Sequence, residues 1–304
     1  MPHSGNHSGH ESNSRCRSNG DARGFLRRTY RSLKRTVLHD TLLLPYGVRK
    51  HRALRQSVDR SQTATYTSFC RSPTQLEALL GPVLDHLDPG PPASKPLRIL
   101  VFACSNGAEV YTLASALMRR YPGIDLHVDA SDVSEEMVRK ARSGLYTRDE
   151  VLDGDHVSDA FVDFTFDRSH EGLRVKPGIK SRVTFARADL LDPGLTDRFQ
   201  TADIVVVQNV LFHLEPAAAR TAFRRACGRL KERAALFVDG MDLDLKLELT
   251  RELGLTPLEY KCREIYRESR AHHPVAWWNY YYGAEPYLVL RRDRVRRYST
   301  IFLR

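Results

Sequence analysis

Cysteine is scarce in this sequence, and long hydrophobic runs are missing from it. The 304 residues include five cysteines, and no two of them form a C-x-x-C pair. Five thiols cannot all pair within one chain, so this pattern argues against a disulfide-stapled fold and against a metal site of the zinc type. No apolar run approaches the ~20 residues that span a bilayer, and Leu42 to Leu44 is too short for a signal-peptide core. We therefore expect a cytoplasmic protein.

Basic residues outnumber acidic ones, and the excess lies at the two ends. The net charge is +10, and residues 1–60 hold 13 Lys and Arg against 4 Asp and Glu, while residues 291–304 hold 6 against 1. Residues 1–24 have little to bury and are predicted to be a disordered basic tail. Residues 25–96 are predicted to be an N-terminal helical segment and linker, because Phe25–His39 has the spacing of a basic amphipathic helix. That helix could meet nucleic acid or an anionic membrane, although we favour packing on the domain.

Strand-like and helix-like patterns alternate from Leu97 onward. The first strand covers Ile99–Ala103, a small polar turn covers Cys104–Gly107, and a second strand ends at Asp132 before a helix from Ser134. Later elements are strands at Val183–Ala186, Asp203–Val207 and Ala234–Asp239, with helices at Pro216–Leu230 and Leu243–Leu253. Such alternation predicts an α/β fold over residues 97–304, with a doubly wound, mostly parallel sheet.

Three other regions complete the prediction. Gln75–Leu87 is predicted to be a helix, followed by a connector at Asp88–Pro96. Thr147–Gly178 is polar, and we expect partly irregular structure there that covers one edge of the ligand pocket. The last two strands of the sheet are predicted at Leu258–Tyr266 and Tyr287–Leu290.

Polar groups follow the ends of the predicted strands. In a parallel sheet a ligand binds beyond these carboxyl ends, where small residues let the backbone approach it. Asp132 lies 25 residues after Gly107, close to the roughly 20-residue interval at which an acidic side chain meets a ribose. A dinucleotide-binding loop needs three glycines, and this turn has only one of them, Gly107. The turn therefore favours S-adenosylmethionine over NAD as the cofactor.

Four stretches, in order, resemble the CheR-type chemotaxis-receptor methyltransferases. ACSNGAEVYTLA is similar to the glycine-loop motif A-x-C-S-T-G-E-E-P-Y-S-L-A, and TYTSFCRSPTQLEAL is similar to the T-x-F-F-R-D-P segment. ASDVSEEMVRKARSGLY resembles the second motif, and DIVVVQNVLFHLEP resembles the R-N-V-x-I-Y-F segment. The resemblance covers about Thr65 to Pro216. It implies a Rossmann-like class I methyltransferase with a seven-stranded sheet, one strand of which is antiparallel.

The resemblance also implies a cofactor site. Asp132 would accept from the ribose hydroxyls, and Glu109 would hold the ammonium group of the cofactor. Asp189 and Leu190 would frame the adenine. The full set predicted to bind the cofactor is Thr67, Arg71, Ala103, Cys104, Ser105, Gly107, Glu109, Asp132, Val133, Asp189, Leu190, Asn209 and Val210.

Arg71 and His213 are the candidate catalytic residues. The resemblance implies transfer of a methyl group to a carboxylate, of a protein glutamate or a small acid, or to another oxygen or nitrogen. Arg71 could hold a carboxylate bidentately, and an ionised acceptor needs no general base. His213 stands where the family has tyrosine, and Gln208 stands where it has arginine. A histidine there could serve as general base for a hydroxyl or an amine, or could simply line the pocket in its neutral form.

Two other functions stay open at this point. The chain could be a binding protein that keeps the fold without turnover, because the residues expected near the acceptor depart from the family pattern. It could also methylate nucleic acid, which the basic ends suggest. We rank that function lower, because the charge lies outside the predicted site and the Asn or Asp, Pro, Pro, aromatic signature is missing after Val207.

Overall fold

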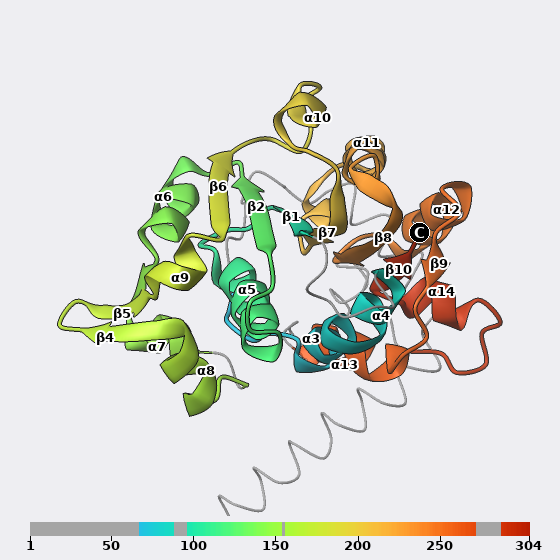
Figure 1. Ribbon diagram of the computed structural model, residues 1–304. Coiled ribbons are helices and arrows are strands. Elements are labelled where there is room, and N and C mark those ends of the chain that lie inside the picture. Colours follow the sequence, from blue (N-terminus) through green and yellow to red (C-terminus); the bar gives the residue numbers. More distant parts are fainter. Residues whose placement is uncertain (1–66, 88–95, 154–155, 272–286) are drawn as a thin grey trace, which may run out of the picture.

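A seven-stranded sheet forms the centre of the molecule. The computed structural model describes residues 67–87, 96–153, 156–271 and 287–304 (Figure 1). The strands are ordered β6, β2, β1, β7, β8, β10, β9. Their bounds are β1 (Leu97–Phe102), β2 (Leu126–Asp132), β6 (Val183–Arg187), β7 (Ala202–Gln208), β8 (Leu230–Asp239), β9 (Thr256–Pro257) and β10 (Ile301–Leu303). All neighbours from β6 to β8 are parallel, and β10 is antiparallel to both β8 and β9. The predicted mostly parallel sheet is confirmed.

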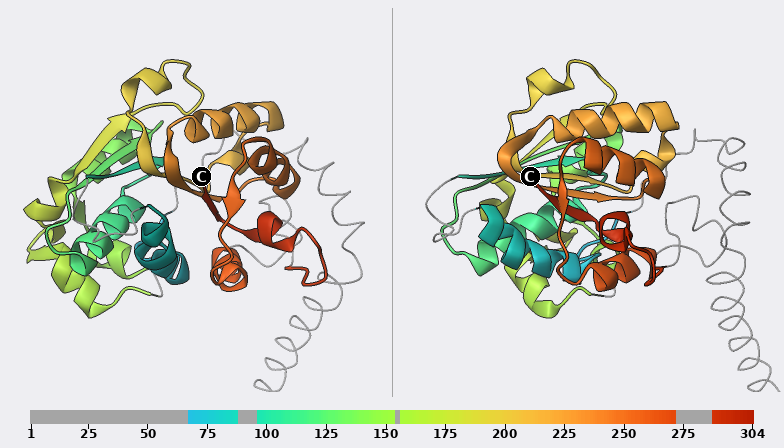
Figure 2. Two further views of the ribbon diagram at one scale, coloured as in Figure 1. Left: turned by 45° about the vertical axis from the view of Figure 1, so that its right-hand side comes forward. Right: turned by 90° about the vertical axis from the view of Figure 1, so that its right-hand side faces the viewer.

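Helices cover both faces of this sheet (Figure 2). One face carries α3 (Pro73–Ala78), η2 (Leu79–Val83), α4 (Leu84–Leu87), α5 (Ala108–Arg120), α6 (Glu135–Ser143) and α13 (Cys262–Ala271), and the other carries α10 (Leu195–Arg198), α11 (Pro216–Cys227) and α12 (Leu243–Glu252). Successive strand residues alternate between the two cores, since Ile99 packs with α5 and Leu100 packs with α11 and α12. The central strands are therefore apolar on both sides, as expected of a doubly wound sheet.

The segment before the first strand packs into the main core. Phe69, Leu79 and Val83 are fully buried against the face that also holds α5. The helix predicted at Gln75–Leu87 is present as three pieces, because Gly81 has non-helical dihedral angles and Pro82 lies inside the π-helical turn η2.

The prediction for the last two strands was wrong. The chain forms β9 and β10 instead, and most of the stretch assigned to Leu258–Tyr266 belongs to the turn before α13 and to α13 itself. The side chains of Ile265 and Tyr266 are buried on α13, so their apolar character reflects a helix rather than a strand. Tyr287 packs its ring on Tyr266 and on Tyr298 of α14 (Arg294–Tyr298), outside the sheet.

The region from Leu145 to Lys180 also differs from the prediction. It forms a small antiparallel sheet ordered β3, β5, β4, with β3 (Leu145–Tyr146), β4 (Phe166–Ser169), β5 (Gly172–Val175) and the helices α7 (Arg148–Leu152), α8 (Asp159–Thr165) and α9 (Pro177–Lys180). Phe166 packs edge-on against Phe69 and Tyr146, so buried aromatic rings order this region despite its polar surface. Its described residues line no part of the cavity at the strand ends, contrary to our expectation.

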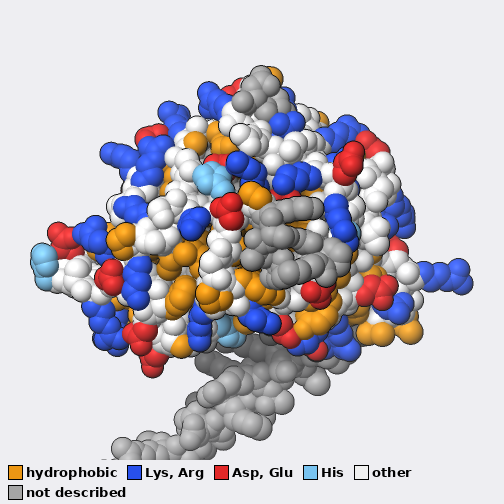
Figure 3. Space-filling view, viewed as in Figure 1, with side chains coloured by type: hydrophobic (Ala, Val, Ile, Leu, Met, Phe, Trp, Pro, Cys, Tyr) orange, Lys and Arg blue, Asp and Glu red, His pale blue; other side chains and the backbone are white. Residues whose placement is uncertain are grey.

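Two of our predictions concern residues outside the described ranges. They are the tail at residues 1–24 and the basic helix at Phe25–His39. On the face shown in Figure 3, basic, acidic and hydrophobic side chains are interspersed. Among the described residues, no helix combines the length and the apolar character needed to cross a bilayer.

Candidate functional site

The site is a cavity at the carboxyl ends of the central strands. The volume of this cavity is about 140 Å³. Its wall includes nine of the thirteen residues predicted to bind the cofactor, together with both candidate catalytic residues. The nine are Thr67, Arg71, Ala103, Ser105, Glu109, Asp132, Val133, Asn209 and Val210. Residues from four separate segments thus converge, as the topology of a parallel sheet leads one to expect.

The turn after β1 has an unusual backbone. Ala103 and Ser105 have φ values of 55° and 49°, and Asn209 at the end of β7 has a φ of 54°. Such left-handed conformations are costly for Ala and Ser, less so for Asn, and persist in the first two only where the surroundings enforce them. All three residues line the cavity. The chain therefore keeps strained backbone at the edge where a ligand would contact it.

Asp132 connects the first two strand ends. One carboxylate oxygen accepts the backbone N–H of Ser105 at 2.8 Å, and the other accepts the backbone N–H of Ser134 at 2.9 Å. The side chain is 8% exposed. A carboxylate has about four lone-pair positions, so two remain for other donors such as the hydroxyls of a ribose. The alternative role as helix cap is taken by Ser134, whose hydroxyl accepts from the N–H of Met137.

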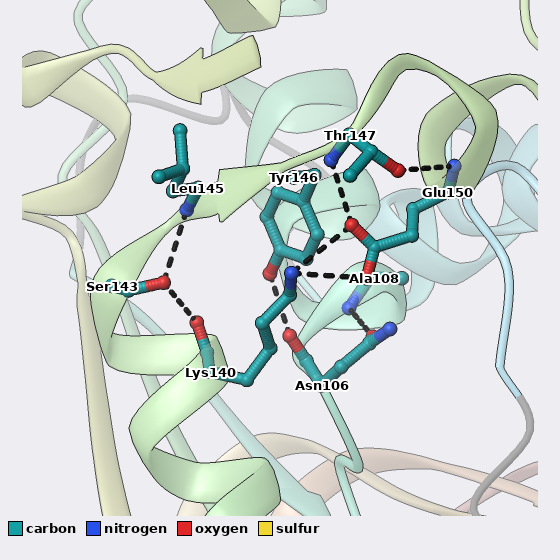
Figure 4. A network of polar contacts seen from close by, with 8 residues as sticks. All are labelled: Asn106, Ala108, Lys140, Ser143, Leu145, Tyr146, Thr147 and Glu150. Carbon is teal, nitrogen blue, oxygen red and sulfur yellow. Dashed lines mark hydrogen bonds and ion pairs between the residues drawn. The ribbon is translucent and has the colours of Figure 1, made fainter. Parts of the chain in front are cut away.

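The outer side of the same turn is braced by polar contacts (Figure 4). The hydroxyl of Tyr146 donates to the backbone carbonyl of Asn106 at 2.6 Å, and the side chain of Asn106 accepts the N–H of Ala108 at 3.1 Å. Lys140 bonds Glu150, which closes a capping box with Thr147 at the start of α7. These contacts hold the turn from behind and leave its inner side to the cavity.

Glu109 brings a carboxyl group of altered acidity into the site. It lies in the first turn of α5 and is partly buried in the cavity wall. Burial raises its pKa to about 7, the charge of Arg71 opposes this shift, and the charge of Asp239 adds to it. A cationic group next to Glu109 would favour the ionised form, so this carboxyl suits the ammonium of an amino acid.

Arg71 reaches the cavity from a segment that buried aromatic packing holds in place. The ring of Phe69 meets the ring of Tyr146 edge-on at 5.0 Å, and the backbone N–H of Cys70 donates to the hydroxyl of Thr112 at 3.2 Å. These contacts fix the backbone at residues 69 and 70, directly before Arg71. Thr67 and Arg71 thereby lie in the same wall as the turn after β1.

The end of β7 contributes His213 through the single 3₁₀ turn η3 (Leu211–His213). The imidazole is partly buried, and its ring centroid lies 4.1 Å from that of Phe212. Burial lowers the pKa of His213 below its usual 6.5. The side chain is therefore neutral at neutral pH and can accept a proton or a hydrogen bond.

Four predicted residues lie outside the cavity wall. Cys104 is buried behind the turn. Gly107 has a φ of 86°, and an added Cβ would meet Ala141 at 2.9 Å, so helix packing rather than ligand approach requires glycine there. Leu190 is buried in the core on the other face of the sheet.

Asp189, the fourth, lines a separate shallow pocket beside Val133, Arg187 and Arg198. Val133 borders both hollows, so the shallow pocket adjoins the main cavity.

The sequence alone did not reveal a hydrogen-bonded pair of side-chain amides in the wall. The side-chain amide of Gln208 donates to that of Gln75 at 2.9 Å, and Gln75 donates in turn to the hydroxyl of Thr300 at 2.9 Å. The sequence shows that Gln208 stands where the family has arginine. Its partner Gln75 lies 133 residues away in the chain, and no local pattern indicates that the two side chains meet. Within the described ranges, no three His, Cys, Asp or Glu side chains gather as a metal site would require.

The fold and the site together define the class of protein. A seven-stranded sheet with one antiparallel strand, and a cavity with an acidic residue at the tip of β2, is the arrangement of a Rossmann-like class I methyltransferase. Residues 65–249 match the family described as CheR methyltransferase, SAM binding domain. The chain belongs to this family, and its cofactor is S-adenosylmethionine.

Curated relatives agree with this assignment. A probable biofilm formation methyltransferase, WspC, of Pseudomonas aeruginosa is 27% identical over 213 residues, which are 69% of this chain and 49% of WspC. Chemotaxis protein methyltransferase 1 of the same organism is 31% identical over 194 residues, 61% of this chain and 68% of the relative. Chemotaxis protein methyltransferase 2 of Vibrio cholerae is 25% identical over 187 residues, 60% and 64% of the two chains. The chain thus spans about half the length of WspC.

The cavity fits the cofactor of the family. Asp132 retains free lone pairs for a diol, Glu109 offers a carboxyl that ionises readily beside a cation, and the strained turn at Ser105 exposes backbone to the ligand. These residues would hold the ribose, the ammonium and the methionine portion, in that order.

Proposed function

We propose that this protein transfers a methyl group from S-adenosylmethionine to a carboxylate oxygen. The observation that carries the proposal is the position of Arg71 in the same cavity wall as Asp132 and Glu109. A guanidinium binds a carboxylate through two parallel hydrogen bonds, which orients the oxygen as well as attracting it. When bound, the cofactor would supply an electrophilic methyl group on a sulfonium, whose carbon–sulfur bond breaks, with the electron pair left on sulfur, as the acceptor oxygen bonds to the methyl carbon.

The residues of the chain would then act mainly by placement. Methyl transfer is an in-line displacement, for which correct alignment of the two reactants supplies much of the acceleration. Arg71 orients the acceptor, while Asp132 and Glu109 fix the donor. A carboxylate is ionised at neutral pH and gives up no proton, so the neutral His213 lines the pocket and is not needed as a base.

The nature of the relatives supports a carboxylate acceptor. Two of them are named as chemotaxis protein methyltransferases, and the sequence resembles enzymes that modify glutamate on receptors. A protein glutamate and a small organic acid both satisfy the chemistry of Arg71. We further propose a cytoplasmic location, which the four buried free thiols of the described residues support.

Two measurements test this function. Titration calorimetry with S-adenosylhomocysteine should show binding in the low-micromolar range to the intact chain. Incubation with methyl-labelled cofactor and carboxylic acids should then give a product whose label is released as methanol by mild alkali, because esters hydrolyse and methylamines do not. If the intact chain binds no cofactor, the proposal is wrong. Label that resists alkali would point to a hydroxyl or nitrogen acceptor instead.

A further inference from the structure

The turn before α14 exposes two large hydrophobic side chains. Within the described ranges four such side chains are exposed, and two of them, Val289 and Leu290, are neighbours in the chain. Val289 is 53% exposed and Leu290 is 98% exposed. The other two are Val133, which borders the cavity, and Leu152 on α7. A single exposed hydrophobic residue is ordinary, but an adjacent pair with one member almost wholly exposed indicates a contact surface.

The backbone of this turn is held by two hydrogen bonds. The N–H of Arg291 donates to the carbonyl of Leu288 at 3.2 Å, which closes a turn with Val289 and Leu290 at its two central positions. The N–H of Leu288 donates to the hydroxyl of Tyr298 on α14 at 3.2 Å. In Figure 1 the loop that enters α14 extends outward at the side of the molecule.

Aromatic rings form the base of the turn. The ring centroid of Tyr287 lies 4.6 Å from that of Tyr298 and 6.1 Å from that of Tyr266, and both of these partners are buried. The guanidinium of Arg263, an exposed residue of α13, lies 5.8 Å from the centroid of the Tyr287 ring. The turn therefore presents its apolar side chains from an ordered base, so little conformational entropy is lost when they are buried.

Arginines surround the two apolar side chains. Arg292 and Arg294 follow them in the chain, and both are exposed. Asp293, which lies between these arginines, accepts two hydrogen bonds from Arg291, at 2.9 and 3.0 Å, so its charge is compensated. Glu259 is a second acidic residue near the base of the turn. The arginines of the turn and of α13 outnumber these two acidic groups, and the surface is therefore positively charged.

We infer that residues 288–294, which we call the apolar-basic turn, dock the protein on a membrane surface that contains anionic lipid. Val289 and Leu290 enter the boundary between the headgroups and the acyl chains, and the arginines beside them contact the lipid phosphates. Anionic lipids are abundant in the leaflet that faces the cytoplasm, which agrees with the location proposed above. The inference does not rest on the proposed methyl transfer.

The polarity of the turn favours a lipid surface over a nucleic acid or a folded protein. A nucleic acid would be bound by the arginines alone, because its phosphates gain nothing from an exposed leucine. A folded protein would need a pocket matched to the protruding Leu290, whereas a lipid surface adapts to the shape that meets it. Apolar side chains inserted among basic ones are what peripheral proteins use on anionic membranes.

Sedimentation with lipid vesicles tests the docking surface. The intact chain should bind vesicles of phosphatidylcholine and phosphatidylglycerol in a ratio of about three to one, and should bind pure phosphatidylcholine at least about tenfold more weakly. Leu290→Ser should lower the affinity for the anionic vesicles by about tenfold, because the burial of a leucine side chain is lost. Arg292→Glu should lower it by at least about tenfold, because an attracted charge is replaced by a repelled one.

Matched control variants lie on α7. Leu152→Ser removes another exposed leucine, and Arg148→Glu reverses the charge of another exposed arginine. Figure 1 shows α7 and α14 on opposite sides of the molecule. Both controls should bind the anionic vesicles as the wild type does. Thermal melting of all four variants checks that they fold.

Two outcomes overturn the inference. One is a wild-type chain that does not bind the anionic vesicles, whether or not it binds duplex DNA. The other is equal vesicle binding by Leu290→Ser and Leu152→Ser, which would assign the attachment to a different part of the chain. Cofactor binding and ester formation from soluble acids do not involve the apolar-basic turn, so their failure would reject the proposed function and leave this inference in place.

Discussion

The backbone N–H of Ser105 donates to the carboxylate of Asp132 across 2.8 Å, so the tip of β2 holds the turn that follows β1. The same carboxylate also accepts the N–H of Ser134. One acidic side chain therefore has two tasks, because it shapes the loop and offers its remaining lone pairs to the ligand. Substitution at this position should affect both folding and binding.

Asp132→Asn tests that double role. The amide nitrogen cannot accept a hydrogen bond, so one backbone N–H loses its partner and the negative charge is lost. Hydrogen bonds to charged groups contribute about 1.5–3 kcal/mol, and we expect cofactor affinity to fall by about 10- to 100-fold. Calorimetry measures the affinity, and urea unfolding measures the loss of stability. The control is Asp129→Asn, on the same strand but paired with His127 and outside the cavity wall. Equal effects of the two variants would contradict the assignment.

Asp132 and Asp189 show how far the sequence could predict the site. Both were expected at strand tips, and the structure confirms the two strands: Asp132 is the last residue of β2, and Asp189 lies two residues after β6. Asp132 lines the cavity because β2 neighbours β1, so its position follows from the order of the sheet. The position of Asp189 depends on how the chain turns away from the edge strand β6, and that path has no periodic signal. Edge loops are for this reason harder to predict than the central crevice.

The amide pair and the last strands show a second limit. Gln75 and Gln208 meet only because α3 packs over β7, a tertiary contact between residues far apart in the chain. β10 has three residues, which is too short for a period-two pattern to stand out. Local sequence patterns predicted the long central strands, whereas short edge strands and long-range polar pairs depend on packing.

Cofactor binding should depend on pH through Glu109. Its pKa of about 7 lies above the usual value because the group is buried, so the neutral form prevails below pH 7. A bound ammonium requires the ionised form. We therefore expect S-adenosylhomocysteine to bind about tenfold more tightly at pH 8 than at pH 6, with net proton release near pH 6. Calorimetry in buffers of different ionisation enthalpy measures the protons released.

Glu109→Gln is the companion variant, and it should remove both the pH dependence and the proton release. It also tests stability. A carboxyl with a raised pKa in the folded state binds more protons there than in the unfolded state, so stability falls as pH rises from about 4.5 to about 7. The upper limit of this loss is about 3 kcal/mol. Urea unfolding at pH 5 and pH 8 should therefore show a smaller difference in Glu109→Gln than in the wild type.

Tyr146→Phe removes the contact that braces the turn from behind. The tyrosine ring is fully buried, and its hydroxyl donates to the carbonyl of Asn106. Loss of one buried hydrogen-bond partner costs about 1–3 kcal/mol, which urea unfolding should detect. Cofactor affinity should also fall, because the turn loses its support. Tyr121→Phe is the control, since its hydroxyl donates to the carbonyl of Leu80, away from the turn, and it should leave affinity unchanged.

Arg71→Lys examines how the acceptor is held. Lysine keeps the positive charge but cannot form two parallel hydrogen bonds to a carboxylate, so the acceptor would be attracted without being oriented. We expect kcat for ester formation to fall by about 10- to 100-fold. Arg119→Lys makes the same change at an exposed position on α5 and should leave the rate as it is. If both variants keep wild-type turnover, Arg71 does not orient the acceptor.

His213→Tyr distinguishes a carboxylate acceptor from a hydroxyl or an amine. The substitution restores the residue that the resembling family has at this position, and tyrosine is no base at neutral pH. A carboxylate needs no proton removed, so ester formation from a carboxylic acid should stay within about threefold of the wild-type rate. General-base catalysis contributes about 10²- to 10⁴-fold, and a loss of that size would show that His213 takes a proton from the acceptor.

The rate of the wild-type chain between pH 5.5 and 8 gives an independent check of the role of His213. If neutral His213 acts as the base, activity should fall as the pH drops through the lowered pKa of the imidazole. If Arg71 only orients an ionised carboxylate, ester formation should lose no more activity than the weaker cofactor binding by protonated Glu109 causes.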